Sequence, residues 1–322
     1  MFKRLLNQCT IDLKIRPQGA LLIKSGIPQV SDIDMVWVKV IRNGEEQIYL
    51  PGSSLKGMIR AHAERIARTS VSFGACDPFG KKHSADPSCS DALGRLKKEK
   101  KLDDIATPDA YKRSCPICRL FGNMWIAGRL ATNDAYVDGK PPAIEHRDGV
   151  GIDRFSGGAS HGAKFEMEVI TSGAFKTSIQ ITNFELWQLG LLAFVLQDMK
   201  DGLVRLGLGK SRGLGKIIAE IDSISLNYFL PDKKVSENGH FKLYGAGAMF
   251  DEAKNYGFVE NDVIQVERHL DLEDTAFAQL RQTVKFNDDD FPWREVAEKW
   301  VSFIDGYMTD PLAQYRKGKQ HG

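Results

Sequence analysis

One stretch decides the fold of this 322-residue chain: Pro51-Gly52-Ser53-Ser54-Leu55-Lys56-Gly57-Met58-Ile59-Arg60. Along this stretch and the residues after it, positions that are apolar apart from His62 recur with helical spacing: Leu55, Met58, Ile59, His62, Ala63, Ile66 and Ala67. This spacing predicts an amphipathic helix with one continuous buried stripe, and either Ser53 or Ser54 can cap its start. The remaining faces carry basic residues, namely Lys56, Arg60, Arg65 and Arg68. The exposed side of this helix is therefore a candidate surface for an anionic partner.

Strands are predicted on both sides of this helix. Residues 10–16 alternate apolar and polar side chains, which is typical of a half-buried strand. Asn43-Gly44 separates two apolar segments, residues 36–41 and 47–50, and this arrangement predicts a hairpin. Further strands are expected at residues 129–137, 164–170, 177–181 and 216–226, and a second helix from Phe184 to about Met199, capped by Asn183. The order of elements predicts an α+β fold with a ferredoxin-like, RRM-type sheet and two helices on one face.

Five cysteines occur in the chain, and two of them form the pair Cys115-Pro116-Ile117-Cys118. Two residues between the thiolates allow both sulfurs to reach one tetrahedral zinc ion. Cys76 and Cys89 are the expected second pair, with His83 as a reserve ligand, and four filled positions indicate a structural zinc. Unligated thiols and a redox pair remain as alternatives, although Leu120-Phe121-Gly122 does not provide the helix start of a redox motif.

The composition is that of a globular protein, with 42% hydrophobic and 27% charged residues. Lys and Arg number 44 against 42 Asp and Glu, a net charge of +2, so any affinity for nucleic acid must come from local patches. No apolar run approaches the roughly 20 residues that span a bilayer, and no membrane partner is expected. The Cys-x-x-Cys pair favours a reducing compartment, so we expect a cytoplasmic protein.

A glycine-rich stretch, residues 207–215, has the chemistry of a phosphate contact. It contains Lys210 and Arg212, and its main chain can approach a phosphate closely. It is not the P-loop of a nucleotide-hydrolysing enzyme, because Val204 stands where that motif requires glycine. The plain alternative is a tight turn that joins a helix to a strand.

The start of the first helix has similar chemistry. A helix N-terminus carries unpaired N–H groups and the positive end of the helix dipole, so it attracts phosphate. Ser53, Ser54 and Lys56 add further donors at this position. An ordinary capped helix remains equally open.

Two carboxylates, Asp32 and Asp34, lie in a polar segment between strands. Loop carboxylates usually form solvated turns. In their functional interpretation, they assist phosphodiester chemistry as a base or as a metal ligand.

Four segments, in their order along the chain, resemble the RAMP superfamily of CRISPR-associated proteins. They are residues 51–57 with Arg60, Cys115-Pro116-Ile117-Cys118-Arg119-Leu120-Phe121-Gly122, Gly149-Val150-Gly151-Ile152-Asp153-Arg154 and residues 207–215. The chain is most similar to the repeated backbone subunit of type III effector complexes (the Csm and Cmr assemblies). Its cysteine-bearing insertion resembles type III-D subunits.

The resemblance implies a domain organisation. A palm of the ferredoxin-like, RRM type would carry a zinc-binding insertion and a projecting β-hairpin thumb. The boundaries would be residues 1–75 for the first part of the palm, 76–120 for the insertion, 121–226 for the second part of the palm with the thumb at about 139–162, and 227–322 for a C-terminal extension.

The resemblance also implies a function. Such subunits assemble along a CRISPR guide RNA, each holding about six nucleotides, beside other RAMP subunits and a large effector subunit. They cleave the bound target RNA by attack of a ribose 2′-hydroxyl on the adjacent phosphate, with a divalent ion such as Mg²⁺. By position, the catalytic aspartate would be Asp34, with Asp32 as the alternate. The residues expected to contact RNA are Ser53, Ser54, Lys56, Arg60, Arg154, Lys210 and Arg212.

Two other functions remain open. The chain can be a guide-binding subunit without cleavage activity, in which Asp34 is only a loop carboxylate. It can also be an endoribonuclease that processes guide precursors, since RAMP proteins include such enzymes and these use His, Tyr or Lys for acid–base catalysis. His62 lies on the apolar stripe of the first helix, which favours a core role, and His146 and His161 fall in the predicted thumb.

Overall fold

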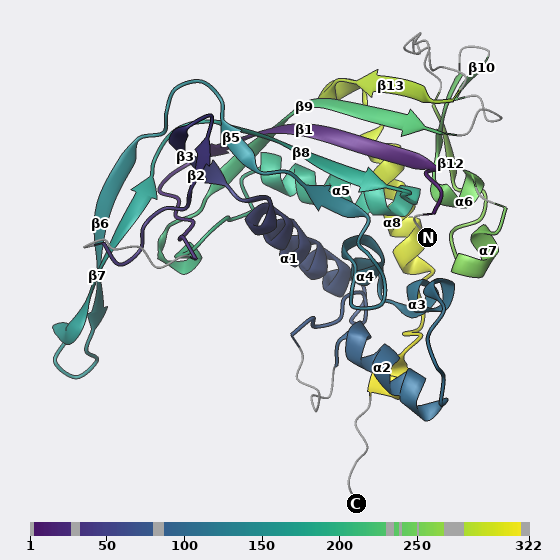
Figure 1. Ribbon diagram of the computed structural model, residues 1–322, viewed down its shortest axis with the longest axis horizontal. Coiled ribbons are helices and arrows are strands. Elements are labelled where there is room, and N and C mark those ends of the chain that lie inside the picture. The colour runs from purple at the N-terminus through teal and green to yellow at the C-terminus, as the bar shows by residue number, and fades with distance from the viewer. Residues whose placement is uncertain are drawn as a thin grey trace, which may run out of the picture.

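Figure 1 shows the computed structural model, which describes residues 3–26, 33–79, 87–229, 235–237, 240–249, 251–266 and 280–316. An antiparallel sheet with the order β13-β9-β1-β8-β5-β3-β2 forms the centre, and β4 also pairs with β8. Its strands are β1 (Asn7–Pro17), β2 (Lys39–Arg42), β3 (Glu45–Leu50), β4 (Leu130–Thr132), β5 (Ala135–Val137), β8 (Phe175–Thr182), β9 (Ile217–Tyr228) and β13 (Gln282–Phe286). Side chains along β1 alternate between buried and half-buried, so one face of the sheet carries the core. This mixed α+β architecture agrees with the predicted fold class.

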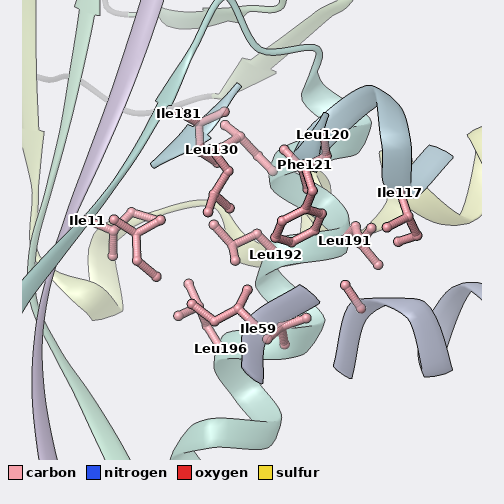
Figure 2. Close-up of a cluster of buried hydrophobic side chains, with 14 of the residues drawn as sticks. Ile11, Ile59, Ile117, Leu120, Phe121, Leu130, Ile181, Leu191, Leu192 and Leu196 are labelled. Carbon is pink, nitrogen blue, oxygen red and sulfur yellow. The ribbon is translucent and has the colours of Figure 1, made fainter. Parts of the chain in front are cut away.

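Two helices, α1 (Gly52–Ser70) and α5 (Leu186–Lys200), lie on the same face of the sheet (Figure 1). Figure 2 shows Ile59 of α1 and Leu192 of α5 packed toward Ile11 and Ile181 of the strands. The apolar stripe predicted for the first helix is thus the side that faces the core, and burying it is the main favourable term in docking the helix.

The start of each helix differs from the prediction. Neither Ser53 nor Ser54 caps α1: Pro51 stands at the N-cap position, and the Gly52 N–H donates to Asp134 Oδ1 over 2.7 Å. Asn183 does not cap α5 either.

Asn183 adopts a left-handed backbone (φ 54°), and its Oδ1 accepts the Leu6 N–H over 2.8 Å. The helix begins later, at Leu186, whose N–H donates to Asp262 Oδ2 over 2.8 Å. A carboxylate from a distant part of the chain thus binds the first N–H of each helix. The start of α5 also has a local capping box, in which the Glu185 N–H donates to Gln188 Oε1 over 3.1 Å.

Two hairpins leave the central sheet. The first, β2–β3, turns at Asn43 (φ 54°) and Gly44 (φ 84°), as the Asn-Gly pair predicts. The second consists of β6 (Ile144–Ile152) and β7 (Ala159–Ile170), which pair only with each other over most of their length and project from the body (Figure 1). This β6–β7 hairpin reaches further along the chain than the residues 139–162 expected for a thumb.

Between α1 and β4 the chain forms three short helices around the cysteines. They are α2 (Cys89–Glu99), α3 (Thr107–Arg113) and α4 (Pro116–Phe121). In the part of the chain that the structure describes, no helix has the length and apolar character needed to cross a bilayer.

The tail beyond residue 226 is part of the body of the protein. Strand β13 extends the central sheet beside β9, and α8 (Trp293–Asp305) covers the outer side of α5. The rings of Trp187 and Phe303 stack there with centroids 4.1 Å apart. The tail also contains β10 (Ser236–Glu237), β11 (His240–Tyr244), β12 (Val263–Val266), α6 (Ala246–Met249), α7 (Ala253–Tyr256) and α9 (Ala313–Arg316), and the chain has 3₁₀ turns η1 (Lys210–Arg212) and η2 (Asp288–Asp290).

The buried Asp262 predicts a pH-dependent stability. Asp262 is 2% exposed, and burial together with the nearby Glu185 carboxylate raises its pKa to about 7. Because the folded state favours the protonated acid, the free energy of unfolding should fall as the pH rises from about 4 to about 7, by up to roughly 1.4 kcal/mol per pH unit. Asp262→Asn should flatten this part of the profile.

Urea denaturation at a series of pH values measures the effect. Asp103→Asn, a change at an exposed aspartate, is the matched control and should keep the wild-type profile. Parallel profiles for Asp262→Asn and the wild type would contradict the assignment.

Candidate nucleic-acid interface and metal centre

Residues 20–23 form the frame of the candidate interface. On one edge, the Leu208 N–H donates to the Leu22 carbonyl (2.9 Å) and the Gly215 N–H to the Ala20 carbonyl (2.8 Å). On the other edge, Leu21 exchanges both of its main-chain hydrogen bonds with Ile170 of β7, each at 2.9 Å. The glycine loop, residues 207–215, and the base of the β6–β7 hairpin are thus fixed to opposite edges of one short segment.

Glycine is required in this loop for close packing. A Cβ on Gly207 would lie 2.1 Å from the Leu22 carbonyl oxygen, and one on Gly215 would lie 2.3 Å from the Leu206 oxygen. Both residues also have positive φ, 79° and 87°. The Arg205 guanidinium closes the loop from within by donating to the Lys210 carbonyl over 3.0 Å. The loop is therefore a preformed turn.

The glycine loop and α1 face each other across a groove of about 390 Å³. Ser54, Gly57 and Met58 line it from the helix, and Gly207 and Lys210 are among its lining residues on the loop. Gly57 is exposed, with nothing within 4 Å of the position of an added Cβ. A glycine inside a helix costs about 1 kcal/mol relative to alanine, and here it leaves the helix main chain accessible from the groove.

Positive charges lie at the groove and on the neighbouring turns of α1. Lys24 and Lys210 line the groove, whereas Lys56 is on the same turns of the helix but outside the groove lining. Partial burial, and then the charge of Arg65, lower the pKa of the Lys210 amine. Burial, and then the charge of Arg60, lower the pKa of Lys56. Within the described ranges neither amine forms an ion pair with a carboxylate. An anion bound beside either amine would offset the repulsion and, as an opposite charge, favour the charged form of the lysine.

Of the two interpretations that the sequence leaves open for the start of α1, a phosphate site and an ordinary capped helix, the hydrogen bonds favour the capped helix. The Gly52 N–H is already bound to Asp134, and the N–H groups of Ser54 and Leu55 donate to the Pro51 carbonyl. A carboxylate at this end satisfies the helix dipole and would repel a phosphate. The flank of the helix, with Ser54 and Gly57, is the side that faces the groove.

The predicted RNA-contacting residues do not all gather at the groove. Ser54 and Lys210 line it, exposed Ser53 and half-buried Lys56 lie on the same first turns of α1, but Arg154 is exposed at the tip of the β6–β7 hairpin.

The two other arginines have partners within the protein. Arg60 Nε donates to Glu64 Oε1 over 3.0 Å, and the Arg212 guanidinium lies 5.2 Å from the centre of the Phe165 ring of β7. Gly149 gives room for that ring, since a Cβ there would be 2.1 Å from Phe165 Cζ. Arg212 thus links the glycine loop to the hairpin.

Asp34 lies at the base of the β6–β7 hairpin. Its side chain is exposed, and Oδ2 accepts the Glu166 N–H over 2.9 Å. The next residue, Met35, continues the pairing with β7 through its own N–H and the Glu166 carbonyl (3.0 Å). The alternate residue, Asp32, and the reserve zinc ligand, His83, fall outside the described residues.

His62 is a partnered core residue. Its Nε2 lies 2.5 Å from Asp198 Oδ2 on α5, and its Nδ1 lies 2.8 Å from Arg65 Nη2. With both ring nitrogens engaged and the residue 8% exposed, His62 joins α1 to α5 and is poorly placed to accept a proton from a substrate.

The four predicted cysteines come together in one cluster. The Sγ atoms of Cys76, Cys89, Cys115 and Cys118 all lie within 4.8 Å of one another, and all four residues are buried. Sulfur atoms bound to one tetrahedral zinc at about 2.3 Å are separated by roughly 3.8 Å, which this cluster can match with small adjustments. The donor set can therefore hold a metal ion such as zinc and leaves no open position for catalysis. Zinc as the bound ion stays a prediction.

Sequence reasoning missed three features of these sites. Asp134, which binds the tip of α1, lies 82 residues away in the sequence. The role of Gly57 can be inferred only from its position in the groove. Arg316 reaches the cysteine cluster from the far end of the described chain. The only signal available in the sequence was the glycine at position 57, which is unusual inside a helix.

Antiparallel strands, helices on one face and a glycine loop beside the first helix define an α+β protein of the ferredoxin-like kind. The chain matches the family model of the RAMP superfamily over residues 21–218, and with more than half of its length matched it belongs to that superfamily. Membership indicates a CRISPR-associated, RNA-binding subunit that works with other CRISPR proteins. A comparison with curated proteins gives no match.

The cysteine cluster predicts a metal content. The purified chain should contain one zinc ion, and Cys118→Ala should remove it and lower the midpoint of thermal unfolding, since a structural metal contributes folding energy. Cys9→Ala is the matched control, because Cys9 is also fully buried but lies on β1 outside the cluster. Metal analysis with thermal denaturation measures both, and full zinc content in Cys118→Ala would contradict the site.

Proposed function

We propose that this chain is the guide-RNA-binding backbone subunit of a type III CRISPR effector complex, and that it cleaves target RNA held on the guide. The observation that carries the RNA-binding part is the groove between α1 and the glycine loop. It combines the open helix surface at Gly57, which lets a ligand approach closely, with the amines of Lys24 and Lys210. Lys56 lies on the adjacent turns of α1. Cationic side chains of this kind contact phosphates without reading sequence.

The path of the guide follows from the charges. Asp134 blocks the tip of α1, so the sugar–phosphate backbone would run along the flank of the helix and over the glycine loop. The β6–β7 hairpin begins at the other edge of residues 20–23. As a thumb, it would meet the guide–target duplex where the guide leaves the groove, with exposed Arg154 and Phe155 at its tip.

Cleavage is assigned to Asp34. The exposed carboxylate lies on the same base of the hairpin, where the target strand would pass. In the proposed step, the ribose O2′ attacks the adjacent phosphorus, the bond from phosphorus to O5′ breaks, and the 2′-hydroxyl proton is removed with the help of Asp34. The leaving O5′ takes up a proton from the solvent. The products are a 2′,3′-cyclic phosphate and a 5′-hydroxyl. A divalent ion such as Mg²⁺, when bound, supplies charge stabilisation at the phosphate oxygens.

A guide-binding subunit without cleavage activity is the second candidate. Within the described residues, Asp34 makes no hydrogen bond or ion pair with another titratable side chain, and such a partner is common at acid–base sites. The third function, processing of guide precursors, has less support, because His62 is occupied by Asp198 and Arg65.

Asp34→Ala separates the first two functions. We expect the variant to lose target cleavage in the assembled complex while its affinity for guide RNA stays within about twofold of the wild type, since the groove is untouched. Asp103→Ala is the matched control and should cleave normally. Gel analysis of a labelled target measures cleavage, and wild-type rates in Asp34→Ala would remove this residue from the reaction.

Lys210→Gln tests the groove, and Lys56→Gln tests the predicted RNA contact on the neighbouring turns of α1. Each should weaken binding to every RNA sequence alike and reduce the slope of log K against log salt by about 0.7 for each phosphate that the variant no longer neutralises. Lys98→Gln is the matched control, because Lys98 is exposed on α2 and forms no ion pair within the described residues. Fluorescence anisotropy at several salt concentrations gives the slopes. Unchanged slopes in both lysine variants would show that the guide RNA does not bind at the groove or at these turns of α1.

A further inference from the structure

The end of the described chain packs against the cysteine cluster. Helix α9 lies on α2, where Arg95 Nη1 donates to the carbonyls of Tyr315 and Arg316, each over 3.1 Å. Leu312 and Tyr315 are buried in this contact. These residues belong to the tail that the sequence assigned to a C-terminal extension without a stated role.

Arg316 makes a direct contact with the cluster. Its Nη2 donates to Cys89 Sγ over 3.2 Å, Nη1 donates to the Pro87 carbonyl over 2.5 Å, and Nε donates to Asp310 Oδ2 over 2.6 Å. The residue is 8% exposed. Donors on three sides of the guanidinium therefore have partners, which fixes its plane against the sulfur.

The charge of a metal-loaded cluster explains why a guanidinium is placed there. Four thiolates around a divalent ion carry a net charge of about −2, and a buried charge of this size requires nearby donors or cations. The Cys115 N–H also donates to Cys89 Sγ, over 3.3 Å. Among the described residues, donors from the neighbouring turn and from the tail both reach the Cys89 sulfur.

Two other arginines, Arg60 and Arg68, lie beside Cys76 and Cys118 on the other side of the cluster. Arg68 Nη2 donates to the Cys76 carbonyl over 2.8 Å. Burial lowers the pKa of Arg60, but the hydrogen bond to Glu64 and then the charges of Cys118 and Cys76 raise it overall, which places Arg60 on this side of the cluster. Both come from α1, which is anchored in the core. The contact at Cys89, by comparison, depends on a segment from the end of the described chain.

We infer that Arg316 is an outer-sphere hydrogen-bond donor of the metal centre, and that metal binding and the docking of α9 stabilise each other. Because the coupling is a free energy, it acts in both directions. Loading the four cysteines holds the tail in place, and the docked tail holds the metal more tightly. The inference rests on the metal centre and not on RNA binding.

Arg316→Gln tests the coupling in the full chain. The variant should bind zinc about 10–100-fold more weakly, the range typical for loss of an outer-sphere partner. Arg294→Gln is the matched control: Arg294 pairs with Glu298 on the exposed side of α8, away from the cysteines. Competition with a chromophoric chelator measures the affinities. An affinity of Arg316→Gln within twofold of the wild type would overturn the inference.

Two further readouts separate this role from a general loss of folding. In cobalt-substituted protein, the sulfur-to-metal charge-transfer band should move to lower energy in Arg316→Gln, and move less in Arg316→Lys, which keeps one donor. Hydrogen exchange at residues 310–316 should accelerate when zinc is removed from the wild type. An unshifted band, or equal exchange with and without zinc, would contradict the coupling. If the chain held no metal at all, this inference would fail, while RNA binding at the groove would stand.

Discussion

The main-chain hydrogen bonds on both edges of residues 20–23 are the constraint on which the candidate interface depends. One edge holds the glycine loop through Leu208 and Gly215, and the other holds β7 through Ile170. A side chain at Gly207 would overlap the Leu22 carbonyl. Position 207 must therefore be glycine for the loop to approach this segment so closely. Backbone geometry therefore fixes the positions of the loop and of the base of the hairpin. Arg205 and Arg212 add side-chain contacts to this frame.

This geometry lets a nearly neutral protein present a local positive groove. The chain as a whole has a net charge of +2, yet Lys56 and Lys210 each have a neighbouring arginine, and burial and repulsion lower their pKa values. An anion bound beside either amine would favour its charged form and offset the repulsion from the neighbouring arginine. Asp134 limits where this can happen, since it neutralises the end of α1 and leaves only the flank. The positions of the charges therefore limit where an RNA backbone can run along α1, and they also favour an anionic ligand.

Local patterns in the sequence predicted the parts of the fold that local physics determines. The stripe of α1, the hairpin at Asn43-Gly44 and the Cys-x-x-Cys pair all follow from residues close together in the chain. Contacts between distant residues were beyond such reasoning. The cap from Asp134 and the donor from Arg316 join residues 82 and 227 positions apart, and the tail could not be placed because β13 and α8 are defined by the sheet and helix that they cover.

Photo-crosslinking of the assembled protein to a guide RNA that carries 4-thiouridine at single positions tests the central claim most directly. One groove for one strand predicts that neighbouring nucleotides crosslink to peptides of α1 around residues 54–58 and to peptides of the glycine loop, within the same molecule. Crosslinks confined to the sheet face around Asp12 and Asp222, or to the lysine-rich end of α2, would contradict it.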